Sequence, residues 1–132
     1  VLVKIAPDLE DIQIKSIVDT ARELGCAGIV ATNTTIMRPF ESSIMSEKGG
    51  LSGKILFEYS NDVLKTLKLY TNGKIQIIGV GGITSADDII KKLNLGATAV
   101  QLYSALVYNG ISLIEKNLYE LIKLLKQFSK KE

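Results

Sequence analysis

The sequence has no histidine and no tryptophan, and its 132 residues include one cysteine and two prolines. Without histidine, the usual zinc ligand sets and any Ser-His or Cys-His nucleophile pair are excluded within these residues. A single cysteine cannot form a disulfide inside the chain, so we interpret Cys26 as a core residue in a reducing compartment. A catalytic base must therefore be another residue type or lie outside this segment.

A strong charge of one sign and long apolar runs are also lacking. Sixteen basic and fourteen acidic residues give a net charge of +2, without a long basic run. This balance gives little support to nucleic-acid binding. No apolar stretch approaches the roughly 20 residues that span a bilayer. Because 46% of the residues are hydrophobic, residues 1–132 are expected to form one globular domain.

Four short runs are rich in apolar and β-branched residues, and each run is continuous rather than alternating in polarity. They cover residues 1–5, 28–32, 75–80 and 98–102. Continuous runs are typical of strands that are buried on both faces of a parallel sheet. The chain opens on the first run, without Met. We interpret this start as that of a fragment.

Segments with helical periodicity separate these runs. Apolar faces of helices are expected over residues 14–24, 63–70, 89–93 and 114–125. Gly25 and Asn72-Gly73 are placed to end the first two helices. Ser85 is expected to cap the third helix, whose inner face should carry Ile89, Ile90 and Leu93.

The order βαβαβαβα predicts an α/β fold with a parallel sheet wrapped by helices. An open doubly wound sheet favours a glycine-rich turn after its first strand, where this chain has Ala6-Pro7-Asp8. A (β/α)₈ barrel instead places phosphate-binding turns after its last two strands. Residues 79–82 and 103–105 stand at those positions. Because a whole barrel needs about 250 residues, we predict the C-terminal half of a TIM (β/α)₈ barrel, with four βα units.

Two turns point to a phosphate group. Gly79-Val80-Gly81-Gly82 joins a strand to a helix through residues that let backbone N–H groups approach an anion. Alone, this motif is more often a tight turn that requires positive φ. The next strand leads to Tyr103-Ser104, where Ser104 is expected to cap a short extra helix. Two neighbouring turns that converge make phosphate the simplest common ligand.

Polar side chains also stand in and after the first two strands. Lys4 lies in an apolar strand, so it must either pair with an acid outside this segment or reach an opening in the barrel mouth. Thr32-Asn33-Thr34-Thr35 follows the second strand, at the catalytic rim of this fold. The following connection, Thr34 to Gly53, is long enough to be a candidate lid.

Five segments together resemble the quinone-linked class of dihydroorotate dehydrogenase, in order and in spacing. The segments are residues 1–9, 32–35, 49–53, 78–83 and 100–108. The resemblance covers essentially the whole chain. It implies flavin mononucleotide (FMN) as cofactor, dihydroorotate and orotate as substrate and product, and a quinone acceptor. It also implies a peripheral position on the cytoplasmic side of a membrane.

The resemblance also implies roles for individual residues. FMN would be contacted by Lys4, Thr32, Gly53, Gly82, Tyr103 and Ser104. Asn33 and Thr34 would hold the orotate ring. The serine base of this class, and the N-terminal helices that receive the quinone, would belong to a missing half. No catalytic base or metal site is therefore assigned here, the isolated segment is expected to be inactive, and the missing half or self-association should cover its open sheet.

Two other functions stay open. The first is a non-catalytic half-barrel that binds a phosphorylated ligand and closes as a homodimer, although Lys4 and Thr32-Asn33-Thr34 would then have no task. The second is another FMN-dependent barrel, related to inosine monophosphate dehydrogenase or a hydroxyacid oxidase. The absent cysteine loop weakens the former relationship, and the absent histidines weaken the latter.

Overall fold

A computed structural model describes residues 1–39 and 48–128. Its centre is a sheet of four parallel strands in the order β1-β2-β3-β4. The strands are β1 Leu2–Ile5, β2 Gly28–Ala31, β3 Gln76–Val80 and β4 Ala99–Gln101. Each strand pairs with the next one along the chain, as in an arc of a (β/α) barrel. The predicted fold, a partial barrel of four βα units, is confirmed.

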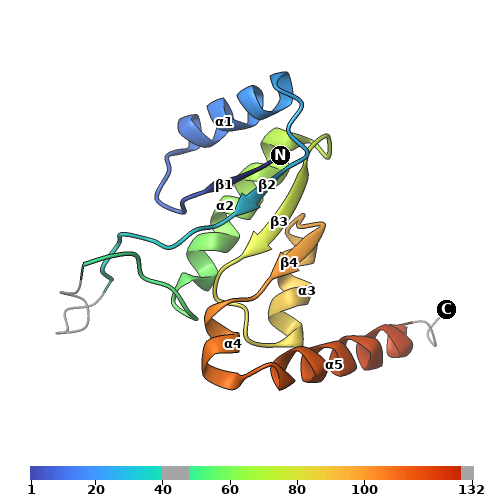
Figure 1. Ribbon diagram of the computed structural model, residues 1–132. Coiled ribbons are helices and arrows are strands. Elements are labelled where there is room, and N and C mark those ends of the chain that lie inside the picture. The colour runs from blue at the N-terminus through green and yellow to red at the C-terminus, as the bar shows by residue number, and fades with distance from the viewer. Residues whose placement is uncertain (40–47, 129–132) are drawn as a thin grey trace.

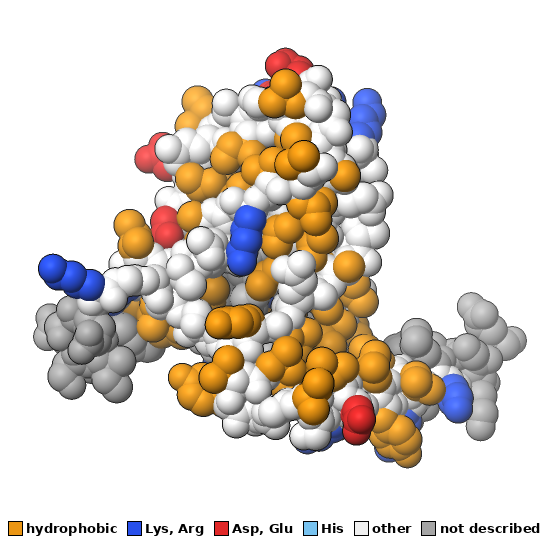
Figure 2. Space-filling model, viewed as in Figure 1, with side chains coloured by type: hydrophobic (Ala, Val, Ile, Leu, Met, Phe, Trp, Pro, Cys, Tyr) orange, Lys and Arg blue, Asp and Glu red, His pale blue; other side chains and the backbone are white. Residues whose placement is uncertain are grey.

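In the described part of the chain, five helices accompany the strands. They are α1 Asp11–Glu23, α2 Leu56–Thr71, α3 Ala86–Asn94, α4 Ser104–Asn109 and α5 Ser112–Phe128. In Figure 1, α2 and α3 lie behind the strands, and no helix of residues 1–39 and 48–128 covers the front face of the sheet. Orange hydrophobic side chains are visible across this front face in Figure 2. The sheet is therefore covered on one side only.

Three helix ends follow the residues expected from the sequence, and one does not. Gly25 has φ 64° after α1, and Asn72 has φ 47° after α2. The Ser85 hydroxyl accepts a hydrogen bond from the Asp88 N–H at 3.2 Å and so caps α3. The prediction for Ser104 is wrong: Tyr103 is the N-cap residue of α4, and Ser104 is its first helical residue.

Burial differs between the centre of the sheet and its edges. All four residues of β2 are buried, because neighbouring strands and helix α2 pack against this strand. At the edges, Leu2 of β1 is 47% exposed and Ala99 of β4 is also exposed. The expectation that every strand is buried on both faces is therefore wrong for β1 and β4, because their exposed residues alternate along each strand and lie on the sheet face that no described helix covers.

Helix α3 turns a different face inward from the one predicted. Ile89 is buried as expected, but Leu93 is 40% exposed and its neighbour Lys92 is fully buried. Hydrophobic periodicity assigns a lysine to the solvent side. The structure instead places Lys92 against Ser60 of α2, which accepts a hydrogen bond from its ammonium group.

The candidate lid, Thr34 to Gly53, contains residues 40–47, which lie outside the described residues. Its two ends are joined by an antiparallel bridge between Thr35 and Leu51. The Leu51 N–H donates to the Thr35 carbonyl at 2.7 Å, and the Thr35 N–H donates to the Leu51 carbonyl at 3.1 Å. Asp8, after β1, accepts hydrogen bonds from the Thr35 hydroxyl and the Ile36 N–H. The base of this connection is thus attached to the rim of the sheet.

Candidate functional site

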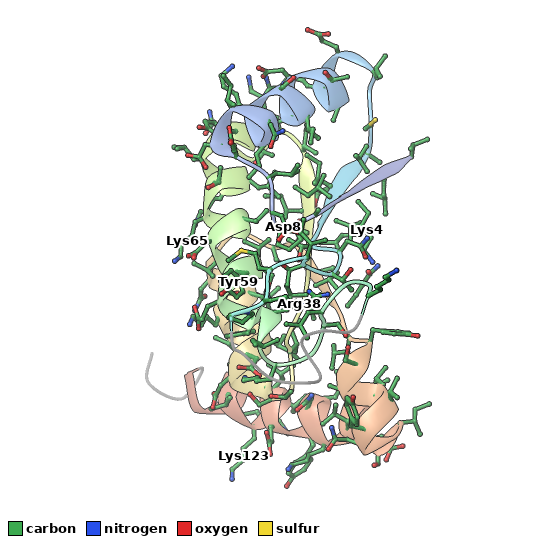
Figure 3. All side chains as sticks on the ribbon, turned by 90° about the vertical axis from the view of Figure 1, so that its left-hand side faces the viewer. Lys4, Asp8, Arg38, Tyr59, Lys65 and Lys123 are labelled. Atoms are coloured by element: carbon green, nitrogen blue, oxygen red, sulfur yellow. The ribbon has the colours of Figure 1, made fainter. Side chains whose placement is uncertain are left out.

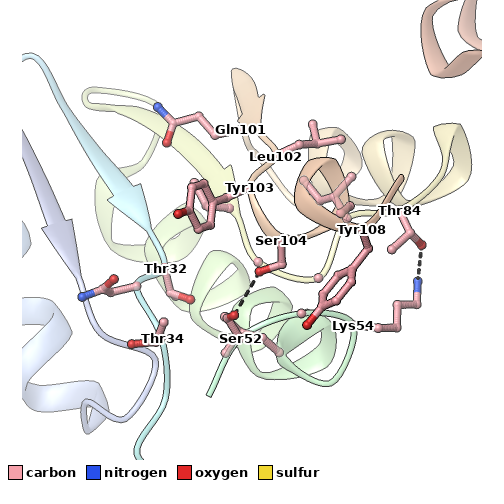
Figure 4. Close-up of a pocket in the computed structure, with 18 of the residues that line it drawn as sticks. Thr32, Thr34, Ser52, Lys54, Thr84, Gln101, Leu102, Tyr103, Ser104 and Tyr108 are labelled. Atoms are coloured by element: carbon pink, nitrogen blue, oxygen red, sulfur yellow. Dashed lines mark hydrogen bonds between the residues drawn. The ribbon is translucent and has the colours of Figure 1, made fainter. Parts of the chain in front are cut away.

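A pocket of about 510 Å³ lies at the carboxyl ends of the four strands, where barrel enzymes carry their active sites. Its volume is in the range of small-molecule sites, about 300–1,000 Å³. All eight residues that the resemblance singles out line it: Lys4, Thr32, Asn33, Thr34, Gly53, Gly82, Tyr103 and Ser104. Figure 4 shows the side chains converging from separate strands and connections.

Lys4 and Thr32 come from the first two strands. Lys4 is exposed, and Figure 3 shows it extending from β1 on the side opposite to α1 and α2. It lines the pocket and, among residues 1–39 and 48–128, forms no ion pair. Lys4 therefore lies at the opening of the pocket, and its pairing with an acid outside residues 1–132 stays a prediction. Thr32 is 1% exposed, and its hydroxyl oxygen has no hydrogen-bond partner within the described part of the chain.

Asn33 and Thr34 continue the chain along the pocket wall. The Asn33 N–H donates to the Ile5 carbonyl at 2.7 Å, which fixes the backbone at the end of β1 and β2. Gly50 packs so closely on Thr34 that an added Cβ would overlap the Thr34 side chain. The base of the long connection therefore determines where the Thr34 hydroxyl lies.

The glycine turn after β3 can only be built from glycine. Gly81 and Gly82 have φ 114° and 69°, values that other residues rarely adopt. A Cβ on Gly82 would lie 2.6 Å from the backbone nitrogen of Phe57, in the first turn of α2. Among the residues that the structure describes, the N–H groups of Gly81 and Gly82 have no hydrogen-bond partner. They are available to an anion in the pocket.

Ser104 and Tyr103 form the wall that follows β4. The Ser104 hydroxyl lies 2.9 Å from the Ser52 hydroxyl, so a hydrogen bond joins α4 to the residue before Gly53 (Figure 4). Tyr103 is 77% exposed although it lines the pocket. A polar wall with such a ring suits a ligand that has both a phosphate group and a flat apolar part.

A charged cluster lies beside the glycine turn. The Lys54 ammonium donates to both carboxylate oxygens of Asp88, at 2.9 and 2.8 Å, and lies 4.5 Å from the centre of the Phe57 ring. Asp88 also accepts from the Thr84 N–H and hydroxyl at 2.9 and 2.8 Å. Burial alone would raise the pKa of Asp88, but the hydrogen bonds from Lys54 and Thr84 outweigh it and lower this pKa.

Some pocket residues carry no role in the sequence-based assignment: Ser52, Lys54, Thr84 and Tyr108. Ser52 and Lys54 flank Gly53, so their position beside a predicted site residue was a usable signal. Thr84 directly follows the glycine turn and gives a similar signal. Within the described residues, His, Cys, Asp and Glu side chains form no group of three or more that could hold a metal ion.

The model of the protein family "Dihydroorotate dehydrogenase" matches residues 1–125 of this chain. A "Dihydroorotate dehydrogenase (quinone)" of Cereibacter sphaeroides (strain KD131) is 51% identical over 114 residues, which are 86% of this chain and 32% of that protein. The "Dihydroorotate dehydrogenase (quinone), mitochondrial" of Mus musculus is 45% identical over 129 residues, or 96% of this chain and 33% of that protein.

A solved structure that resembles this chain has the same family name as these sequence relatives. A DHODH from Eimeria tenella, crystallised in complex with ferulenol, superposes with a TM-score of 0.89 at 40% identity, over 96% of this chain and 34% of that one. The chain thus spans about a third of the length of the curated relatives it matches, 32% and 33% for the two above. In the portion that the structure describes, no helix is long and apolar enough to cross a membrane.

Proposed function

The chain belongs to the dihydroorotate dehydrogenase family, and we propose that it forms the FMN- and orotate-binding half of the barrel of a quinone-linked enzyme. The enzyme would oxidise dihydroorotate to orotate in de novo pyrimidine biosynthesis and pass the electrons to a quinone. One observation carries the proposal: a single pocket at the strand ends collects all eight residues of the resemblance. The remaining strands would come from outside these residues, and we call the closed assembly the complete barrel.

The residues present fit FMN. The proposed contacts are Lys4, Thr32, Gly53, Gly82, Tyr103 and Ser104. The buried hydroxyl of Thr32 has no partner among the described residues, and an unsatisfied buried group costs about 1–3 kcal/mol, so it favours a ligand in the pocket. The free N–H groups of the glycine turn are further donors that such a ligand could use. When bound, FMN would accept a hydride from dihydroorotate and release electrons to the quinone.

The phosphate of FMN is assigned to the glycine turn and Ser104. The N–H groups of Gly81 and Gly82 can donate to its oxygens, and the Ser104 hydroxyl lies across the pocket on α4. The hydrogen bond between Ser52 and Ser104 holds that wall. Each donor is neutral, so the site binds the anion through several hydrogen bonds rather than through one ion pair.

The orotate ring is assigned to Asn33 and Thr34. An amide and a hydroxyl can donate to and accept from the ring's amide and carboxylate groups. Lys4 adds a positive charge at the same opening, which favours anionic species in the pocket. The base that removes the proton from dihydroorotate is expected to be a serine outside this segment, so residues 1–132 alone would not catalyse the reaction.

The same proposal gives the partners and the location. Residues 1–132 act as one domain unit, whose uncovered sheet face and edge strands β1 and β4 would be completed by the other barrel strands. Self-association of this segment is the alternative way to cover that face. The quinone would reach the cofactor through segments outside these residues, with the enzyme peripheral on the cytoplasmic side of a membrane.

The test uses the purified complete barrel. We expect visible flavin absorption that bleaches when dihydroorotate is added without oxygen. The variant Asn33→Ala should keep the flavin bands but lose bleaching at the same dihydroorotate concentration, whereas Asn94→Ala, an exposed asparagine of α3, should behave as the unmodified protein. A barrel that binds flavin and is never reduced by dihydroorotate would refute the proposal. Phosphate binding without flavin would favour the non-catalytic module.

A further inference from the structure

Lys92 of α3 is the largest fully buried side chain in the described part of the protein, with 0% exposure. Its stem passes Gly79 of β3 so closely that a Cβ there would lie 3.2 Å from Lys92 Cδ. Its ammonium donates a hydrogen bond to the Ser60 hydroxyl and lies 5.1 Å from the centre of the Phe57 ring. A buried lysine is costly without a compensating anion.

The carboxylates near Lys92 already pair with other lysines. Glu58 of α2 binds Lys91 at 2.7 Å, and Asp88 of α3 binds Lys54 at 2.8 Å. No carboxylate forms an ion pair with Lys92 in residues 1–39 and 48–128. Burial lowers the pKa of Lys92 to about 8, although the charges of Glu58 and Asp88 act against this shift. The ammonium thus lacks a direct counter-ion.

Ser60 connects this ammonium to the glycine turn. Its hydroxyl can donate to the Phe57 carbonyl at 2.9 Å or to the Gly81 carbonyl at 3.2 Å. The peptide between Gly81 and Gly82 is trans. In a trans peptide the N–H points opposite to the C=O. A Gly81 carbonyl directed at Ser60 therefore turns the Gly82 N–H away from Ser60 and towards the pocket.

From these contacts we propose that Lys92 is a positioning residue for the phosphate group of FMN. The ammonium acts through Ser60 to orient the peptide between Gly81 and Gly82, and it places a buried positive charge behind the turn. The inference rests on the proposed function and deepens it. It assigns the selection of a phosphorylated flavin to Lys92, a residue that does not line the pocket.

The proposal predicts opposite effects on two properties. In the protein without FMN, the buried charge opposes folding, so Lys92→Met should leave the melting temperature unchanged or raise it. With FMN bound, the same charge attracts the phosphate, so Lys92→Met should weaken FMN binding. A residue with a merely structural role would lower both the melting temperature and the affinity.

The experiment measures dissociation constants of the complete barrel for FMN and for riboflavin, which lacks the phosphate, at pH 7. For Lys92→Met we expect FMN to bind about tenfold more weakly and riboflavin to bind unchanged. Lys123→Met is the matched control, because it makes the same charge change on α5, away from Lys4 (Figure 3). The control should preserve the preference for FMN.

A second variant and a pH series guard against misfolding of the first. Ser60→Ala removes the link but keeps the charge, so it should weaken FMN binding by a smaller factor than Lys92→Met. In the unmodified barrel, FMN affinity should fall as the pH rises through about 8, where Lys92 loses its proton. Glu58, Asp88, Lys91 and Lys54 are the charged groups around position 92, and they are present in both the unmodified barrel and Lys92→Met. The difference between the pH profiles of these two proteins therefore isolates Lys92.

The outcomes separate cleanly. Unchanged FMN affinity in Lys92→Met, or an equal loss of FMN and riboflavin with a lower melting temperature, overturns the role of Lys92. If the unmodified barrel binds no FMN at all, the proposed function fails and this inference fails with it. Loss of FMN preference in Lys92→Met, with riboflavin binding and melting temperature preserved, supports the role.

Discussion

Two regions lie against the same sheet and differ in composition and in exposure. The first, the aliphatic core, includes Ile14, Val18, Ile29, Leu64 and Leu67 between α1, α2 and the strands. The second, the charged layer, consists of Lys54, Ser60, Asp88 and Lys92 around the Phe57 ring. The aliphatic core is held by burial of apolar area, whereas the charged layer is held by hydrogen bonds and ion pairs.

The charged layer lies beside the pocket, and the difference reflects its position. A layer of hydrophobic residues would stabilise the fold at lower cost, because burying ions carries a desolvation penalty. The Lys92 ammonium in this layer can attract an anion, and Ser60 can orient the glycine turn, which an aliphatic layer cannot do. With the role proposed for Lys92, stability would come chiefly from the aliphatic core and ligand selectivity from the charged layer.

The largest expected effect comes from Gly82→Ala, at the boundary between the pocket and the charged layer. The new Cβ would meet the Phe57 backbone at 2.6 Å, and φ is 69°. Overlap and strain together should cost about 4 kcal/mol of unfolding free energy and abolish FMN binding. Urea denaturation and FMN titration of the complete barrel measure both. Gly73→Ala is the control, with φ 72° but no atom near the added Cβ; an equal loss there would show that backbone strain alone is responsible.

The next effect tests the aliphatic core. Leu64 is 0% exposed, and Leu64→Ala should cost about 3 kcal/mol of unfolding free energy through lost burial and a cavity. The ratio of FMN to riboflavin affinity in the folded protein should not change. Urea denaturation measures the free energy of unfolding, and flavin titration measures the affinity ratio. A changed affinity ratio would show that the two regions are not separable.

The aliphatic core and the chain order could be read from the sequence. Continuous apolar runs gave the strands, and Ser85 with its flanking residues gave the start of α3. The carboxyl ends of parallel strands share one edge, so Lys4, Thr32, Gly82 and Ser104 could be expected near one another. Local chemistry and topology are sufficient for such features.

The charged layer could not be predicted in the same way. Periodicity places Leu93 inside and Lys92 outside, and the structure reverses both. The reversal depends on Ser60, which is 32 positions away in the sequence and accepts the Lys92 hydrogen bond. Ser104 likewise bonds Ser52 rather than capping α4. Contacts between distant residues determine these features, and no local pattern encodes them.

A smaller effect is expected from Asp88→Asn within the charged layer. The variant loses the ion pair with Lys54 and weakens the hydrogen bonds from Thr84, at a cost of about 2 kcal/mol. Because the folded-state pKa of Asp88 is lowered, its stabilisation is present above the ordinary carboxyl pKa and is lost as the pH falls through the folded-state value. In thermal melts from pH 7 to pH 3, the melting temperature should therefore fall less steeply for the variant than for the unmodified protein. Parallel curves would argue against a stabilising role of the ionised carboxylate.

The smallest expected effect is that of Ser85→Ala, which removes the cap of α3 but no charge. The Asp88 N–H would lose its hydrogen bond to the Ser85 hydroxyl, at a cost of about 1 kcal/mol. Ser85→Thr keeps a hydroxyl and should recover most of that loss in urea denaturation. Because α3 carries both Asp88 and Lys92, a loose first turn would also disturb the charged layer. If Ser85→Ala lowers FMN affinity as much as Lys92→Met does, the placement of the whole helix, rather than the lysine charge, governs the phosphate site.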